Sequence, residues 1–352
     1  MNLRVGDWVR VRSEEEIRRT LDESGCLDGL PFMPQMLQSC GQRFRVSKRA
    51  HKMCDPSGGP LPRRMQEAVF LEELRCDGDA YGGCEMQCRI IWKEAWLERI
   101  DESSESDVEK ATRHHRNNDG GALEELVSRN SKRRSTSANG EPTWEYRCQA
   151  TRIPAATTPL ARLDFVQYVE DLRYGNATVR EVVRAICLEV FEQSAVLGIG
   201  LGSFMRWSWD RLHGLVNGPP YPYRRGRLPN GSRTPTANLG LAPGDLVRIK
   251  TYEEIRNTIT EDLSNRGLTF SAEMVPYCGQ TMQVSKRLTR VINEKTGHLI
   301  ELKNPCLVLD GAVCTGLYAR PFMCPRGLPP YWREIWLERV EQARSSEVQA
   351  RP

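Results

Sequence analysis

The sequence lacks a long apolar run and a secretory signal. Its longest uncharged apolar stretch lies between Glu192 and Arg206, which is shorter than the ~20 residues that a membrane-spanning helix requires. The first residues alternate charged and apolar side chains and contain no apolar core of a signal peptide. We therefore expect no transmembrane helix, no membrane partner and a cytoplasmic location.

Histidine is scarce, net charge is small and the common catalytic patterns are absent. The chain has 5 histidines, and we find no phosphate-binding loop, no His-Glu-x-x-His helix and no Ser/His/Asp order. The formal net charge is only +4, too small to indicate a polyanionic partner without a local basic cluster. The sequence thus favours a non-catalytic protein over an enzyme.

What the chain does contain is enough apolar material for two or three globular domains, and an internal repeat. Of its 352 residues, 39% are hydrophobic and 27% charged, as is typical of folded proteins. Residues 6–49 align without a gap to residues 244–287, and 21 of the 44 positions are identical. The match resumes at 92–99 and 332–339. We infer the duplication of a whole domain rather than a short repeat array.

The region between the copies divides into linkers and a helical segment. Residues 101–143 contain no aromatic residue, a composition that predicts disorder. A capping box at Thr178 and Glu181, with an earlier helix over 163–173, predicts a helical hairpin that packs on a neighbour through Val179, Val182, Val183, Ile186 and Val190. The predicted organisation is a first domain at 1–100, a disordered linker at 101–143, a helical segment at 144–216, a Pro/Gly-rich linker at 217–242, a second domain at 243–342 and a tail at 343–352.

Each copy begins with Gly-Asp followed by a strand of alternating apolar and basic residues, GDWVRV and GDLVRI. Later strand patterns at 68–74 and 89–97, with a short helix over 14–23, predict a mostly β domain. This order resembles SH3-like barrels of the KOW and Tudor type. The resemblance implies an α+β, mostly β chain with two homologous SH3-like barrel domains joined by a helical hairpin and linkers. The composite pattern of HKxCD, RCDG, GGCxxxC and WKEAWLER also resembles bacterial proteins without an assigned activity.

The chain has 12 cysteines, which in a cytoplasmic protein indicate buried thiols or metal ligands rather than disulfides. Cys54, Cys76, Cys84 and Cys88 could complete a tetrahedral zinc shell, or hold an iron–sulfur cluster. We favour zinc, with His51 and Cys40 as alternative ligands. Nearby glycines, Gly78 among them, would let the backbone turn tightly around such a centre.

The second copy provides an internal comparison for this site. Cys54 aligns with Ile292 and Cys88 with Leu328, as expected if a lost metal site were refilled by apolar packing. Three further cysteines are shared between the copies: Cys40, Cys76 and Cys84 align with Cys278, Cys314 and Cys324. Shared cysteines are also compatible with buried thiols that bind no metal, so both interpretations remain open.

Two other groups of residues suggest binding sites in the first copy. Arg43, Arg45 and Arg49 share one face of a predicted strand, which could follow the phosphates of a nucleic acid or simply face solvent. Trp92 and Trp96 could form an aromatic site for a cation, or belong to the core.

Together these features predict a non-catalytic adaptor or accessory protein with a structural zinc in its first domain and a protein partner. One alternative is an accessory enzyme that depends on an iron–sulfur cluster or on a reactive thiol among the four cysteines. A further alternative is nucleic-acid binding through the three arginines.

Overall fold

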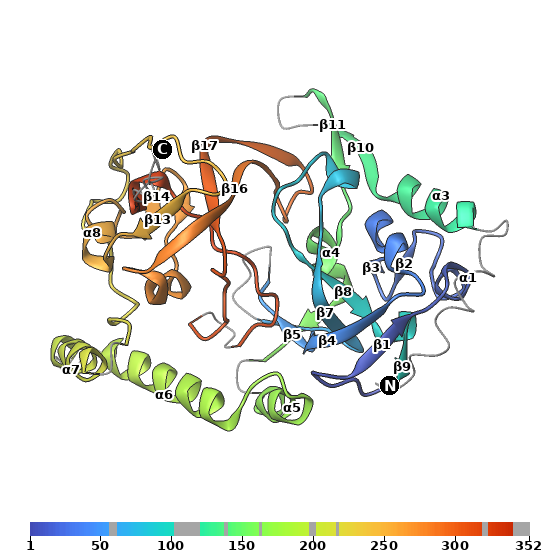
Figure 1. Cartoon of the computed structure of the whole chain (residues 1–352), viewed down its shortest axis with the longest axis horizontal. Helices are drawn as coiled ribbons and strands as arrows, with labels where there is room; N and C mark the ends of the chain where they lie inside the picture. Colours follow the sequence, from blue (N-terminus) through green and yellow to red (C-terminus); the bar gives the residue numbers. More distant parts are fainter. Residues whose placement is uncertain are drawn as a thin grey trace, which may run out of the picture. The chain divides into compact units, whose positions relative to one another are not determined.

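The computed structural model describes residues 1–55, 62–101, 120–136, 140–161, 164–196, 202–215, 218–318 and 323–340 (Figure 1). Residues 102–119 and 137–139 of the expected linker, and the tail at 343–352, lie outside the described residues. Contacts divide the chain into two compact units. The first comprises Met1–Leu197, Arg290–Leu302 and Cys314–Leu328, and the second comprises Gly198–Thr289, Lys303–Val313 and Pro329–Pro352. Two segments of the second repeat therefore belong to the unit of the first repeat, unlike the predicted domain boundaries.

The first repeat forms a curled antiparallel sheet of half-barrel shape (Figure 1). Its strands, in the spatial order β8-β7-β4-β1-β9, are Arg89–Lys93, Ala68–Arg75, Arg43–Arg49, Trp8–Val11 and Leu97–Ile100. The α1 helix (Glu14–Arg18) follows β1 and is shorter than predicted, because Asp22 accepts backbone hydrogen bonds from Ser24 and Cys26 and turns the chain. The short strands β2 (Cys26–Leu27) and β3 (Leu30–Pro31) and the 3₁₀ helix η1 (Pro34–Ser39) lead to β4.

The second repeat forms a related sheet, with its main elements in the same order as in the first repeat. Its curled sheet has the spatial order β17-β16-β13-β18, with strands Leu299–Leu309, Thr281–Ile292, Leu246–Ile249 and Leu337–Arg339. Helix α8 (Tyr252–Arg256) follows β13, and β14 (Ser264–Asn265), β15 (Leu268–Thr269) and η4 (Ala272–Tyr277) lead to β16. A single bridge between Leu307 and Trp332 stands where β7 pairs with β8 in the first repeat. The chain is thus mixed α and β, with two half-barrel sheets.

Equivalent aromatic residues form the core of each sheet. Trp92 and Trp96 are fully buried, and the ring of Phe32 packs edge-on against both at centroid distances of 6.1 and 5.2 Å. Phe270 packs in the same way between Trp332 and Trp336 in the second repeat. Because no face of the Trp92 or Trp96 ring is open to a cation, these two residues belong to the core rather than to an aromatic binding site.

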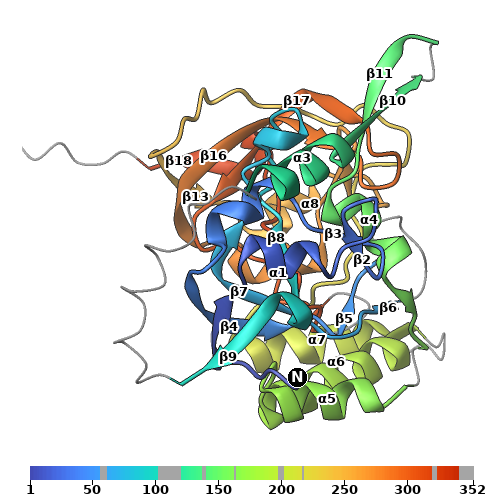
Figure 2. The same cartoon turned by 90° about the vertical axis from the view of Figure 1, so that its right-hand side faces the viewer.

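Part of the expected disordered linker is folded, so this prediction was wrong for the residues that the structure describes. Helix α3 (Gly120–Asn130) buries Leu123 and Val127 in the core of the first unit. The hairpin of β10 (Lys132–Thr136) and β11 (Pro142–Tyr146) follows and projects from the unit (Figure 2). The absence of aromatic residues misled the prediction, because two aliphatic side chains four positions apart are enough to attach a helix.

The helical segment begins with α4 (Gln149–Ala156) and continues, in the first unit, with α5 (Val166–Tyr174) and α6 (Val179–Val196). Between α4 and α5 the chain forms the short strand β12 (Thr158–Pro159). This strand pairs with β6 (Arg63–Arg64), and β6 pairs with β5 (Lys52–Met53), so that the three strands form a small sheet. The predicted capping box of α6 is present, since Thr178 and Glu181 exchange hydrogen bonds. Gly175 ends α5 with a φ of 76°, which glycine adopts without strain.

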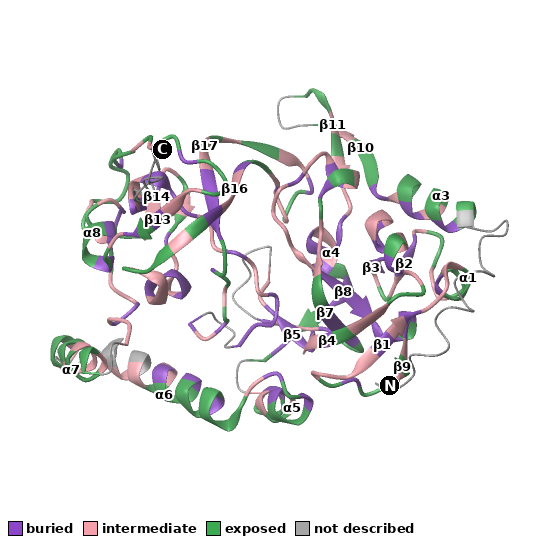
Figure 3. Cartoon of the chain, viewed as in Figure 1, coloured by how far each residue is buried: buried purple, intermediate pink, exposed green. Residues whose placement is uncertain are grey.

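The predicted packing of the α6 stripe is wrong for four of its five residues. Val182 is buried, whereas the other four side chains are exposed: Val179, Val183, Ile186 and Val190 (Figure 3). Helix α7 (Gly202–Gly214) belongs to the second unit, where residues 218–242 form no helix but bury Tyr221, Thr234 and Leu241. None of the described helices combines the length and apolarity needed to cross a bilayer.

Candidate functional site

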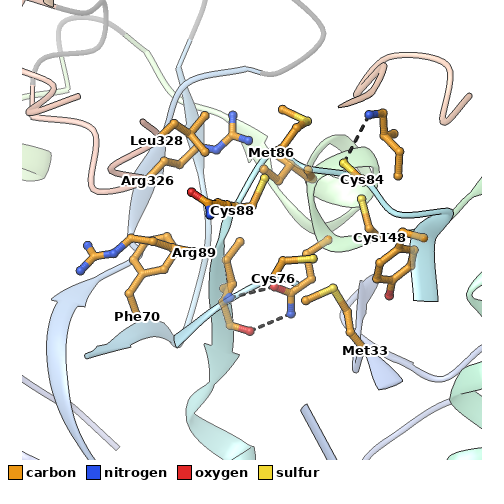
Figure 4. Close-up of a pocket in the computed structure, with 17 residues that line it drawn as sticks. Met33, Phe70, Cys76, Cys84, Met86, Cys88, Arg89, Cys148, Arg326 and Leu328 are labelled. Atoms are coloured by element: carbon orange, nitrogen blue, oxygen red, sulfur yellow. Dashed lines mark hydrogen bonds between the residues drawn. The ribbon is translucent and has the colours of Figure 1, made fainter. Parts of the chain in front are cut away.

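Three of the four predicted metal ligands line one cavity in the first unit (Figure 4). Cys76, Cys84 and Cys88 face it together with Cys148, the N-cap residue of α4, and with the side chains of Met33 and Met86. Figure 4 places Cys84 and Cys148 on one side of this cavity and Cys88 with Arg326 on the other. Gly78 allows the chain to return from Cys76 to Cys84, because a Cβ atom there would lie 1.8 Å from the Cys84 carbonyl oxygen.

The cavity is small and mostly apolar. It encloses about 30 Å³, enough for one or two water molecules and too small for an organic substrate. Burial raises the pKa of Cys76 to about 12 and that of Cys148 to about 11, so both are protonated thiols at neutral pH. Burial also raises the pKa of Cys88 well above its usual value. These cysteines behave as buried thiols in this arrangement.

The fourth predicted ligand, Cys54, does not line this cavity. Within the described ranges, no group of three or more His, Cys, Asp or Glu side chains is arranged to hold a metal ion. The alternative ligand His51 is buried elsewhere, with Nε2 3.3 Å from Asp171 Oδ1. Cys40 follows η1, and burial raises its pKa to about 12. A zinc or iron–sulfur site therefore rests on the sequence pattern alone.

Cys54 instead lies beside a cysteine and an arginine of the second repeat, all within the first unit. The backbone N–H of Cys54 donates to Cys324 Sγ at 3.3 Å. Arg326 Nη1 donates to Cys54 Sγ at 3.5 Å, and its Nη2 is 2.5 Å from Glu294 Oε1. Arg326 and Cys324 are buried, while Cys54 is partly accessible. The arrangement is a cysteine pair with a fixed cation at one sulfur.

The surroundings favour the thiolate form of Cys54. A hydrogen bond with the Cys324 thiol, together with the positive charge of Arg326, lowers the pKa of Cys54 to about 6 against the opposing effect of burial. The same hydrogen bond, together with burial, raises the pKa of Cys324 well above its usual value. The two shifts have opposite directions and favour Cys54 as the thiolate and Cys324 as the thiol of the pair. A thiolate next to a second thiol can attack a disulfide and then be released by its neighbour.

A matching contact links the equivalent positions of the two repeats. The backbone N–H of Ile292 donates to Cys84 Sγ at 3.4 Å, and the alignment pairs Ile292 with Cys54 and Cys84 with Cys324. In one contact the first repeat provides the N–H group and the second repeat the sulfur atom. In the other contact these roles are reversed. The expectation that Ile292 is buried is confirmed, since 3% of it is exposed. Only the Cys54 contact places two sulfur atoms together.

The three arginines predicted to form one face do not share a face. A bulge between Val46 and Lys48 shifts the register of β4, which turns Arg49 inward. Arg49 is buried, pairs with Glu94 and stacks on Tyr174 at 4.3 Å. Arg45 donates to the Gly6 carbonyl, and Arg43 lies over the Trp8 ring. The alternation read from the sequence therefore does not produce a phosphate-binding face.

Sequence reasoning missed the roles of Cys148, Cys324 and Arg326. The alignment showed that Cys84 and Cys324 are equivalent, but equivalence of positions does not reveal that one repeat contacts the other. An Arg two residues after a shared cysteine was the one available signal. No protein-family model matches this chain, and no curated protein is significantly similar to it.

Proposed function

We propose that the protein is a cytoplasmic, thiol-dependent accessory protein in which Cys54 is the nucleophile and Cys324 the resolving thiol. The observation that carries this proposal is the contact of Cys54 with both Cys324 and the Arg326 guanidinium. Cys54 alone of the pair is partly accessible, as a nucleophile that meets an external disulfide needs to be. A reducing compartment would keep both thiols free between turnovers.

The proposed reaction is thiol–disulfide exchange with a disulfide substrate, and it balances in two steps. The Cys54 thiolate attacks one sulfur of the substrate, forming a mixed disulfide, and the departing thiolate takes up a proton from solvent. The Cys324 thiol then loses its proton and attacks the Cys54 sulfur, and the second substrate thiolate is released and protonated. The substrate disulfide is reduced to two thiols while Cys54 and Cys324 are oxidised to a disulfide.

Reaction with dithiodipyridine tests this proposal. All chains carry Cys187→Ser, which removes the exposed cysteine of α6. In this background the chain with both Cys54 and Cys324 should rapidly release two equivalents of pyridinethione and acquire a disulfide between these two residues, identified by peptide mass mapping. The Cys324→Ser variant should stop at the mixed disulfide after one equivalent, and Cys54→Ser should lose the rapid phase. Cys84→Ser is the matched control, because Cys84 makes the equivalent contact with Ile292 and has no sulfur partner there. A rapid phase that survives Cys54→Ser would contradict the proposal.

Adaptor function is a second candidate, and an exposed apolar face supports it. Helices α5 and α6 of the first unit expose seven aliphatic side chains: Val166, Val169, Leu172, Val179, Val183, Ile186 and Val190. Apolar clusters of this kind mark protein-binding surfaces. A partner protein held by the native chain should be lost from Val183→Glu/Ile186→Glu and kept by Arg180→Glu, which adds negative charge at an exposed polar position of α6. Equal retention by all three chains would exclude this face.

A further inference from the structure

The second unit contains a polar cavity that no sequence motif indicated. It encloses about 270 Å³ and lies between the coil at 236–238, the β14–β15 turn and the start of η5 (Glu334–Trp336). Three arginines line it, Arg266, Arg287 and Arg333, against the single carboxylate of Glu334. Arg287 forms an ion pair with Glu334 at 2.5 Å. The remaining two guanidinium groups give the cavity a surplus of positive charge.

Arg333 is buried without a carboxylate partner. It is 8% exposed, and its Nη atoms donate to the backbone carbonyls of Asn304, Pro305 and Arg266 and to the Cys306 sulfur. Its Nε has no hydrogen-bond partner in the part of the chain that the structure describes. No ion pair to Arg333 occurs among the described residues, and burial, with repulsion from Arg266, lowers its pKa. A buried guanidinium with an unused donor and no counter-ion is costly unless an anion is bound beside it.

The first repeat shows how the same position is neutralised. Arg333 is equivalent to Lys93, and Arg266 is equivalent to Asp28. In the first repeat Lys93 Nζ donates to Asp28 Oδ2 at 2.8 Å and to the Gln66 carbonyl at 3.1 Å. The second repeat keeps the buried cation but replaces its acidic partner by another cation. The exchange of Asp for Arg leaves a place for an external negative charge.

We propose that this cavity binds the phosphate group of a small organic phosphate through Arg333 and Arg266. A phosphate monoester carries nearly two negative charges at neutral pH, which matches the two guanidinium groups that lack acidic partners, whereas a carboxylate carries one. Arginine forks suit phosphate oxygens, and the side chains of both Arg333 and Arg266 line the cavity. Nε of the Arg266 guanidinium donates to the Thr234 carbonyl at 3.0 Å. The rest of the cavity, lined by Asn265, Asn304 and Thr236, suits a polar ligand body.

Calorimetric titration with glycerol phosphate, inorganic phosphate and glycerol tests the site in the full chain at constant ionic strength. Glycerol phosphate should bind, glycerol should not, and inorganic phosphate should bind at least tenfold more weakly. The double variant Arg266→Asp/Arg333→Lys, which recreates the pair of the first repeat, should weaken glycerol phosphate binding at least a hundredfold. Its melting temperature without ligand should equal or exceed that of the native chain, because the buried cation regains a partner.

Arg225→Asp is the control for charge, since Arg225 is exposed and does not line the cavity. It should bind glycerol phosphate within a factor of two of the native chain. If the double variant does not fold, Arg266→Ala alone should weaken binding at least tenfold. Absence of binding by the native chain, equal binding by native and variant chains, or tighter binding of inorganic phosphate than of glycerol phosphate would each overturn the proposal.

Discussion

At the scale of single residues, the pKa of a cysteine depends on a few neighbouring groups. Cys54 and Cys76 were equivalent candidates in the sequence, yet the pKa of one is about 6 and that of the other about 12. Hydrogen bonds with Cys324 and Arg326 lower the pKa of Cys54, whereas burial is the main cause that raises the pKa of Cys76. Spacing identified both as possible ligands but could not distinguish them, because the neighbours of Cys54 come from about 270 positions further along the chain.

The pH dependence of alkylation at Cys54 follows from this environment. Its rate of reaction with iodoacetamide should rise with a midpoint near pH 6, because the thiolate is the reacting form and its pKa is lowered to about 6. Arg326→Met should move the midpoint upward by about one pH unit, since a neighbouring positive charge is removed. Quantitative peptide mass spectrometry gives both rates, with Cys84 in the same digest as the internal control. A midpoint above pH 8 in the native chain would show that Cys54 is an ordinary thiol.

A buried ion pair attaches α5 to β5 of the small sheet. Lys52 Nζ donates to Asp171 Oδ2, and both side chains are fully buried. Asp171→Ala should lower the free energy of unfolding by about 3–5 kcal/mol, because it leaves a buried ammonium group without its counter-charge. Lys52→Met/Asp171→Leu should recover most of this loss, since both charges are then removed together. Urea denaturation measures both variants, and equal stability of the single and double variants would contradict the explanation.

At the scale of elements, the sequence predicted the main strands of the two half-barrel sheets and misjudged the segments that surround them. The strand over 68–74 and the capping box at Thr178 appear because their signals are local. The strand predicted over 89–97 ends at Lys93, because the 3₁₀ helix η3 (Glu94–Trp96) interrupts it before β9 begins at Leu97. The α3 helix was missed because its low aromatic content was taken for disorder, although Leu123 and Val127 are buried. The face of β4 was misjudged because a bulge depends on the partner strand.

Shortening Leu123, which attaches α3 to the core of the first unit, should therefore destabilise this helix. Leu123→Ala should lower the stability of α3 by about 2–5 kcal/mol, because a fully buried leucine leaves a cavity when it is shortened. Hydrogen exchange at the α3 amides measures the change, and Glu125→Ala at an exposed position of the same helix is the control. In limited proteolysis the native chain should resist cleavage between 123 and 130. Rapid cleavage there would restore the linker interpretation.

At the scale of the whole molecule, the repeat seen in the sequence does not coincide with the compact units. The alignment predicted boundaries at 1–100 and 243–342, but residues 290–302 and 314–328 belong to the unit that contains the first repeat. The alignment could establish which positions are equivalent. It could not show that Ile292 of one copy packs against Cys84 of the other, because no local sequence pattern encodes a contact between residues so far apart in the chain.

This arrangement predicts that a substitution in the second repeat will loosen the first. Ile292 is 3% exposed, belongs to the core cluster of the first repeat and lines its cysteine cavity with Ile91 of β8. Ile292→Ala should lower hydrogen-exchange protection at β7 and β8 by about 2–5 kcal/mol, the range observed for large-to-small changes in a core. Leu309→Ala is the matched control, because Leu309 is equally buried but belongs to the core of the second unit. It should leave β7 and β8 unchanged and reduce protection at β13. If both substitutions affected only β13 and its neighbours, the repeats would be independent domains with the boundaries that the alignment predicted, and the contact of Cys54 with Cys324 would lose its structural basis.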